Sequence, residues 1–497
     1  MPSSQRGINT KGIEALLGDP KKAIIKLSIP IIIAMFVQTL YTLADGIWVA
    51  GMGPEALSAV GFFFPFFVML MGISNGMGIG GGAAISRHIG ARDKNGADMV
   101  AGTTLVLMLI MTVLFTIPAV MFAESIFSAM GADESLYYAT SYAKVMFAGI
   151  LFIFFYNISN ALLRAEGDAN RAMIAMIMGS GLNIILDPIF IYGPNNPGPG
   201  ILDVLLINKY GFDLEVAGAA YATVLSMFIT SILIVFWLFI KRDTYVSFKL
   251  CRAGLKKDIL KDIFKVAIPA ILMHISMATM MLLENIIVVN VGGEDGVAVF
   301  TAGWRMLMIA ILPTLGIATA VISVTGATFG AKRYDKLATA YAFALKFALG
   351  FEIIVAMLMF FLAPLLHRPF TYGEGSERLI VDLIGFIRIM AFFPLAIAFA
   401  MLSSSMFQGI GKGLNALIVT LQRDLIYILP LSSLIGMVLN LGLNGVWVGT
   451  VLGAWLAGIT AFFWGWMEIN NLKQGRFSLV DWLVGRIFKR HKGVQIR

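Results

Sequence analysis

Blocks of apolar residues, separated by short polar stretches, run along this chain almost from end to end. Each block is about 20–28 residues long, and a helix needs about 20 apolar residues to cross a bilayer. Only 13% of the residues are charged, against about 25% in soluble domains. Because about twelve blocks fill the 497 residues, no room is left for a soluble catalytic domain. The pattern predicts an all-α integral membrane protein with twelve transmembrane helices.

The blocks define the expected domains. A basic stretch at the middle of the chain separates six helices from six more, so we expect an N-lobe at 1–241, a cytoplasmic inter-lobe loop at 242–263 and a C-lobe at 264–470. Residues 471–497 form a basic amphipathic tail, which we expect to lie on the inner leaflet. The expected spans are 27–51, 59–88, 99–122, 139–163, 171–192, 215–241, 264–291, 297–329, 338–363, 380–408, 414–439 and 443–468.

The two halves resemble each other in sequence. Three motifs recur in the same order: KLSIP at 26–30 and KVAIP at 265–269, HIGARDKNGA at 88–97 and TFGAKRYDKL at 328–337, and VAGAAYATVL at 216–225 and LNGVWVGTVL at 443–452. Each half has an even number of helices, so both begin on the same side of the membrane. The pattern predicts a parallel internal repeat of two six-helix lobes, as in many transporters; convergent loop chemistry is the alternative.

The distribution of charge predicts the orientation of the chain. The net charge is +8, and most Lys and Arg residues fall in the termini and in alternate loops, whereas acids collect in the opposite loops. By the positive-inside rule we expect both termini to lie in the cytoplasm and the protein to span the cell (plasma) membrane. This topology explains the positive net charge, so we expect no nucleic-acid partner. A single cysteine, Cys251, excludes a disulfide framework and a thiol metal site.

Carboxylates inside apolar helices are the candidate functional residues, because an ionised side chain near the bilayer centre costs about 2.5–3.5 kcal/mol. Asp45 and Asp187 each lie about five residues, or roughly 8 Å, from the outer end of their helices. Thr223 reaches a similar depth, and Asn183 shares a helix face with Asp187. These oxygen ligands suit a small hard cation such as Na⁺, or a proton shared by two acids. The alternative is that they only form helix-to-helix hydrogen bonds.

Glu284 is the repeat equivalent of Asp45, because 45 + 239 = 284. It is therefore a candidate C-lobe acid for an ion or a substrate. The alternative is a buried ion pair with Arg305, Arg388 or Arg423.

Several motifs together resemble the multidrug and toxic compound extrusion (MATE) family, over nearly the whole chain. They are SIP at 28–30, ADGIWVAGMGPEALSAVG at 44–61, IGARDKNGA at 89–97, NALLRAEGDAN at 160–170, LNIILDPIFIYG at 182–193 and GAAYATVLS at 218–226. The segments around Asp187 and LLRAEGD most resemble the archaeal and bacterial DinF-like branch.

The resemblance implies roles for particular residues. Asp45, Asn183, Asp187 and Thr223 would form the ion-coupling site, and Pro30 would be the point at which the first helix bends. Glu166 matches the family's loop between the fourth and fifth helices, in a structural or gating role. The substrate cavity would be lined by Gln38, Tyr142, Asn157 and Asn160. The tenth helix lacks the acid that the NorM-like branch carries there, so the N-lobe is the main candidate.

The resulting prediction is a monomeric secondary transporter, not an enzyme, with no cofactor. It would export organic, cationic or amphipathic compounds by alternating access, against inward Na⁺ or H⁺. A lipid-linked precursor flippase of the same wider superfamily is the alternative, but it would need a strongly basic cavity. A membrane enzyme is disfavoured because the four His residues are dispersed.

Overall fold

The computed structural model describes residues 10–132, 135–199, 202, 207–241, 244–247, 255–371 and 376–476. Cys251 and residues 477–497 of the predicted tail lie outside these residues. The helices of the first half are α1 (Lys11–Leu17), α2 (Pro20–Ala50), α3 (Pro54–Gly90), α4 (Lys94–Ala129), α5 (Leu136–Ala148), α6 (Ile150–Ala165), α7 (Ala169–Ile191), α9 (Ile207–Tyr210), α10 (Glu215–Val235) and η1 (Phe236–Lys241).

The second half of the chain is also helical. Its elements are α11 (Lys257–Ala310), α12 (Leu312–Gly330), α13 (Tyr334–Leu366), η3 (Arg368–Phe370), η4 (Ser376–Leu379), α14 (Ile380–Met390), α15 (Phe393–Gly409), α16 (Gly413–Leu421), η5 (Gln422–Ile428), α17 (Leu429–Ser433), η6 (Leu434–Val438) and α18 (Gly442–Lys473).

Ten helices are long and apolar enough to cross a membrane, and the number rises to twelve if two bent pairs are each one span. The bent pairs are α5 with α6, at 52°, and Glu377–Met390 with α15, at 43°. The described residues contain no β-strand. The predicted all-α membrane fold is therefore confirmed, with the fourth and tenth spans bent rather than straight.

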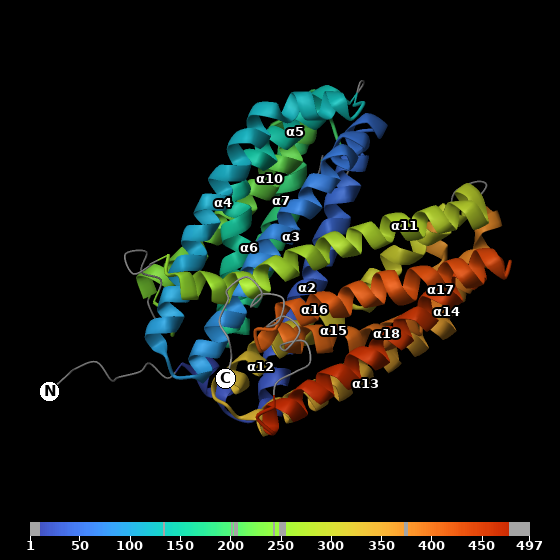
Figure 1. Ribbon diagram of the computed structural model, residues 1–497. Coiled ribbons are helices and arrows are strands. Elements are labelled where there is room, and N and C mark those ends of the chain that lie inside the picture. Colours follow the sequence, from blue (N-terminus) through green and yellow to red (C-terminus); the bar gives the residue numbers. More distant parts are fainter. Residues whose placement is uncertain are drawn as a thin grey trace, which may run out of the picture. The chain divides into compact units, whose positions relative to one another are not determined.

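The chain divides into two compact units. Unit 1 comprises Met1–Leu16 and Ile25–Ile275, and unit 2 comprises Leu17–Ile24 and Ser276–Arg497. Within unit 1, α7 packs on α10, and α3 packs on α4, α5 and α6 (Figure 1). Within unit 2, α15 packs on α12, α13, α16 and α18. Of the three boundaries between the units, one lies at the end of α1 and two lie inside the continuous helices α2 and α11. The domain bounds that the sequence suggests stay a prediction.

Turns at matching positions in the two halves have the same backbone conformation. Arg92, after α3, and Lys332, after α12, both adopt a left-handed conformation, with φ of 58° and 55°. They are 240 residues apart (332 − 92). Non-glycine residues rarely adopt this conformation, so its recurrence at matching positions supports the repeat. Further matched pairs with positive φ are Gly53 and Gly293, Gly167 and Gly411, Asp213 and Asn440, and Glu215 and Gly442.

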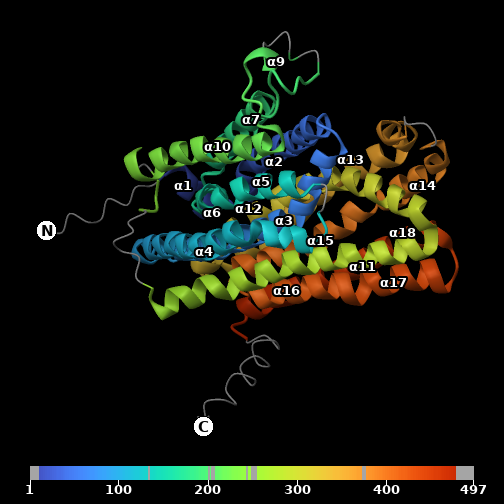
Figure 2. The same ribbon diagram turned by 90° about the horizontal axis from the view of Figure 1, so that it is seen from above.

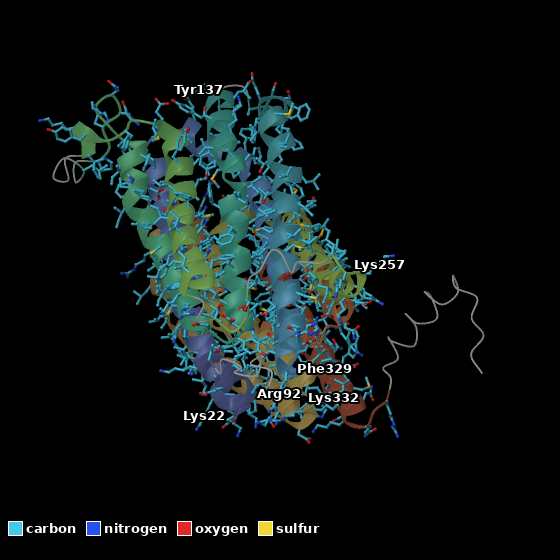
Figure 3. The ribbon with its side chains drawn as sticks, turned by 90° about the vertical axis from the view of Figure 1, so that its left-hand side faces the viewer. Lys22, Arg92, Tyr137, Lys257, Phe329 and Lys332 are labelled. Carbon is cyan, nitrogen blue, oxygen red and sulfur yellow. The ribbon has the colours of Figure 1, made fainter. Side chains whose placement is uncertain are left out.

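The ends of the helices alternate as a multi-pass chain requires. In unit 1, Arg92 and Tyr137 lie at opposite ends of the unit, and in unit 2, Lys22, Phe329 and Lys332 lie together at one end (Figure 3). The connection that contains α9 projects away from α7 and α10 (Figure 2). It returns alongside the end of α7, where Phe212 N donates to Ile189 O at 2.9 Å.

Glycines on α3 allow close packing against two neighbouring helices, α11 and α6. Cβ atoms added at Gly76 and Gly80 would lie 3.1 Å from Ala267 O and 2.8 Å from Ile263 O, respectively, both on α11. A Cβ at Gly78 would lie 2.8 Å from the Ala161 side chain on α6. The run GMGIGGGAAIS therefore fits helix packing through small residues, as is common in membranes, rather than phosphate binding.

Candidate cation-binding site

The four residues of the predicted ion site come from three helices of unit 1. Asp45 is on α2, Asn183 and Asp187 are on α7, and Thr223 is on α10. Asp187 is fully buried, at 0% exposure, and Asn183 and Thr223 are buried. Asp45 is half-buried. The structure thus brings together residues that are up to 178 positions apart (223 − 45).

The four side chains form one connected group. The Asn183 amide lies 3.0 Å from Thr223 Oγ1 and 2.9 Å from Asp187 Oδ2, and both contacts are hydrogen bonds when the amide nitrogen faces the carboxyl group. The carboxyl group of Asp45 lies near that of Asp187 and interacts with it. Asp45 Oδ1 is buried and has no hydrogen-bond partner among the described residues.

This donor set fits a small hard cation or a proton. Two carboxyl groups, an amide oxygen and a hydroxyl offer only oxygen ligands, and the unpartnered Asp45 oxygen supplies one free acceptor. Within the described residues, no group of three or more His, Cys, Asp or Glu is placed to hold a metal ion. Oxygen ligands of this kind suit hard cations, whereas thiolate and imidazole ligands suit softer metals.

A small cavity of about 20 Å³ adjoins the group. That volume is roughly the space for one water molecule. Gln38, Asn183 and Thr223 line it, as do residues that the sequence did not single out: Tyr41, Tyr156, Gly179, Ser180, Ser226 and Met227.

Helical spacing could have indicated some of these additional residues. Tyr41 is four positions before Asp45, Ser180 is three before Asn183, and Ser226 is three after Thr223, so each shares a helix face with a predicted site residue. Tyr156, on α6, is four positions before Asn160, another residue predicted for the site, so it too shares a helix face with one.

The remaining residues of the predicted substrate cavity lie elsewhere in unit 1. Tyr142 packs edge-on against Phe63, with ring centroids 5.2 Å apart. The side chains of Asn157 and Asn160 donate to the carbonyls one turn earlier on α6, at 2.9 and 2.8 Å. None of the three lines the 20 Å³ cavity, so their roles, like the bend at Pro30 inside the continuous α2, stay predictions.

Glu284, the C-lobe acid, is fully buried on α11. The ion pair with Arg305, Arg388 or Arg423 is not formed: Glu284 Oε1 accepts a hydrogen bond from Thr450 Oγ1 at 2.5 Å. Its Oε2 has no partner among the described residues. The predicted alternative was therefore wrong, because the neighbouring helix presents a threonine to this carboxyl group.

Asp424, beside Glu284, has a local cationic partner. Arg423 Nε donates to Asp424 Oδ1 at 2.7 Å, and Ser276 Oγ donates to Oδ2 at 3.2 Å. The second half thus places an arginine beside one of its buried acids.

Glu166 is buried in the turn between α6 and α7, where its Oε2 accepts from Val246 N at 3.1 Å. This contact joins the turn to residues 244–247. Burial raises the pKa of Glu166 to about 8, and the bond from Val246 opposes the rise. In the folded protein Glu166 therefore keeps its proton up to about pH 8, whereas in the unfolded chain it loses the proton near its usual pKa of 4.5.

We expect stability to fall as pH rises from about 4.5 to about 8, because the folded chain binds more protons there than the unfolded chain. Glu166→Gln removes this titration and keeps an oxygen that accepts from Val246. The variant should be the more stable protein above pH 8, and the difference should shrink towards pH 5. Melting temperatures in detergent across this range test it; a difference that does not vary with pH would contradict the assignment.

Comparison with known proteins identifies the family. The model of the MatE family matches residues 30–189 and 269–441. The multidrug export protein MepA of Staphylococcus aureus (strain N315) is 27% identical over 473 residues, which cover 93% of this chain and 96% of MepA.

Solved structures agree with this family. A crystal structure of MATE in complex with MaL6 is 47% identical, with a TM-score of 0.87, over 94% of this chain and 100% of that one. A second structure is of a MOP superfamily transporter from Pyrococcus furiosus, and it is described as having a binding pocket of reverse polarity that suggests a different function. It is 48% identical, with a TM-score of 0.86, over 93% of this chain and 99% of that one. These relatives are named as transporters and export proteins, not as enzymes. With its two related halves of membrane-spanning helices, the chain belongs to the MATE family.

Proposed function

We propose that this protein exports small organic compounds, cationic or amphipathic, by antiport against Na⁺ or H⁺ entering the cell. The observation that carries the proposal is the connected group of Asp45, Asp187, Asn183 and Thr223 inside membrane-spanning helices. Buried acids in such helices are characteristic of ion pathways and proton relays. The names of the relatives, which include multidrug export proteins, support the export of organic molecules.

The acid pair would couple the two fluxes through its charge. A cation bound between Asp45 and Asp187, or a second proton on the pair, neutralises negative charge that is costly at this depth. The protein therefore has different stable arrangements with and without the ion, which is what alternating access requires. One positive charge moving across 100 mV supplies about 2.3 kcal/mol, somewhat under two decades of substrate gradient.

Glu284 is the candidate for a second coupling acid. It is buried, its Oε2 is unpartnered among the described residues, and it occupies the repeat position of Asp45. Two ion-binding acids would allow more than one ion per substrate. The proposal further places both termini in the cytoplasm and the protein, as a monomer, in the plasma membrane.

Transport of a lipid-linked precursor is less favoured. A diphosphate headgroup needs cationic side chains, whereas the 20 Å³ cavity beside the acid pair is lined by neutral polar, aromatic and apolar residues.

Reconstituted vesicles with the Na⁺ and H⁺ gradients imposed separately test the proposal. We expect one of the two gradients alone to drive accumulation of a fluorescent organic cation, and Glu284→Gln to reduce the charge moved per substrate. Transport that responds to neither gradient would overturn the antiport mechanism.

A further inference from the structure

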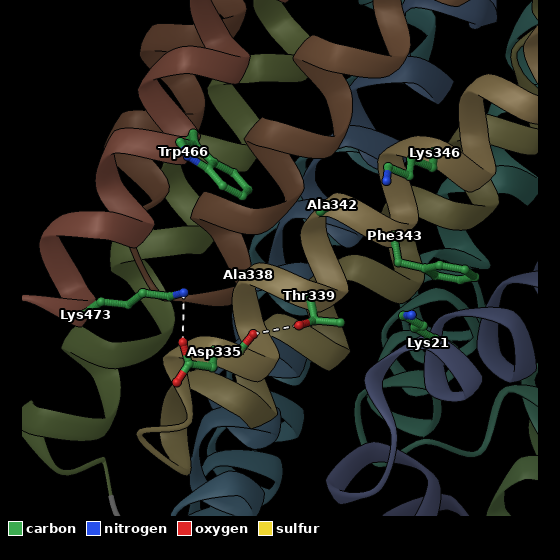
Figure 4. A pocket seen from close by; sticks show the side chains of 9 residues that line it. All are labelled: Lys21, Asp335, Ala338, Thr339, Ala342, Phe343, Lys346, Trp466 and Lys473. Carbon is green, nitrogen blue, oxygen red and sulfur yellow. Dashed lines mark hydrogen bonds and ion pairs between the residues drawn. The ribbon is translucent and has the colours of Figure 1, made fainter.

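A pocket in unit 2 combines three lysines with an apolar wall. It has a volume of about 390 Å³, within the range of small-molecule sites. It lies where the first turn of α2 meets α13 and the end of α18, and its residues are Lys21, Asp335, Ala338, Thr339, Ala342, Phe343, Lys346, Trp466 and Lys473 (Figure 4).

The charges in this pocket are unbalanced. Lys473 Nζ forms an ion pair with Asp335 at 2.8 Å. The ammonium groups of Lys21 and Lys346 have no hydrogen-bond or ion-pair partner among the residues that the structure describes. With three lysines and one aspartate, the lining carries a net charge of +2. The pocket therefore attracts an anion.

The position of Lys346 favours an anion at the membrane surface. Lys346 is twelve residues after Tyr334, roughly 18 Å along α13, inside a helix apolar enough to span the bilayer. A lysine at such a position extends its side chain towards the membrane surface to reach a polar partner. Since Asp335, the carboxylate of the pocket lining, is paired with Lys473, a phosphate at the lipid–water boundary is the nearest chemical match.

The other side of the pocket matches the lipid part of such a ligand. Phe343 is half-buried and Trp466 is 40% exposed, so both present apolar surface beside the lysines (Figure 4). Tryptophan is enriched at the level of lipid headgroups.

Lys21 is held in place by its own segment. Lys336 Nζ donates to Gly18 O at 2.7 Å and to Leu17 O at 3.4 Å, which fixes the residues just before α2 against α13. Lys21 follows in the first turn of α2. The cationic face is thus positioned before any ligand binds, which reduces the entropy lost on binding.

We propose that this pocket binds the phosphate headgroup of an acidic phospholipid, with Lys21 and Lys346 contacting the phosphate and Phe343 and Trp466 contacting the acyl chains. Basic pockets between membrane helices are a known way of holding such headgroups. A water-soluble phosphate could use the same lysines but would gain nothing from the apolar wall.

Binding to the purified full-length protein in detergent, measured by native mass spectrometry, tests the proposal. The probes are dioleoyl phosphatidylglycerol, dioleoyl phosphatidylcholine and soluble glycerol phosphate. We expect phosphatidylglycerol to be retained in preference to phosphatidylcholine. Lys21→Gln with Lys346→Gln should weaken phosphatidylglycerol binding about thirtyfold, because each lysine contributes roughly a factor of five at a membrane surface.

Two further variants show whether a loss of lipid binding is specific to the pocket or results from misfolding. Lys22→Gln with Lys332→Gln removes two exposed lysines outside the pocket and should leave binding unchanged. Asp335→Asn removes the carboxylate and should tighten binding. The proposal would be overturned if the two lipids were retained equally, if both lysine pairs weakened binding equally, or if Asp335→Asn did not tighten binding. Complete competition by glycerol phosphate would also overturn it, because that result would indicate a soluble ligand.

Discussion

Gradient-driven export by Asp187→Asn should fall at least about tenfold below the native rate in reconstituted vesicles, with Asp45→Asn similarly impaired. Each substitution removes one of two neighbouring acids, so the site loses negative charge needed to bind a cation or a proton. A loss of only about 1.4 kcal/mol in ion binding is a tenfold change in affinity. The measurement is the initial rate of fluorescent-cation uptake under an imposed ion gradient.

The matched controls separate coupling from folding. Asparagine has the shape of aspartate, and at position 187 it retains an oxygen that can accept from Asn183, so the variants should be folded and elute with the retention of the native protein. Glu55→Gln neutralises an exposed acid at the start of α3 and should transport normally. Full ion-driven export by both aspartate variants would exclude the acid pair as the coupling site.

The second large effect concerns the packing of α3. Gly80→Ala places a Cβ 2.6 Å from Ala267 Cβ, 2.8 Å from Ile263 O and 2.9 Å from Ala267 N. Two of these atoms are backbone, which cannot move without displacing α11. Overpacking of this kind typically costs about 1–3 kcal/mol, so we expect a melting temperature lower by several degrees and a reduced yield of folded protein.

Gly61→Ala, in the same helix, is the matched control. No atom lies within 4 Å of the added Cβ, and alanine is the better helix former by about 1 kcal/mol. We expect its melting temperature to equal or exceed that of the native protein. Equal effects of Gly61→Ala and Gly80→Ala would show that Gly80 is not needed for the close approach of α3 to α11.

The sequence predicted the helices well, because they depend on local composition. Counting residues from the helix ends predicts one level for Asp45, Asp187 and Thr223. Depth does not determine which face of a helix meets which neighbour. For that reason the sequence did not show that Tyr156 lines the cavity, whereas Asn160, four residues later on the same helix, does not.

The same limit explains the wrong partner for Glu284. An arginine is the expected counter-ion of a buried acid, and three arginines were candidates. Helix packing instead placed Thr450 opposite the carboxyl group, while Arg423 pairs with its neighbour Asp424. The bond from Val246 to Glu166 spans 80 positions, and no periodicity in the chain encodes a contact of that kind.

The matched left-handed turns show what the two halves have in common. Arg92 and Lys332 have one backbone conformation although the residues around them differ, so the turn belongs to the fold of a half rather than to particular residues. Asp45 and Glu284 occupy matching places, as do Thr223 and Thr450. Each half thus has an acid and a threonine, but they are joined differently: Thr450 donates directly to Glu284, whereas Asn183 joins Thr223 to Asp187.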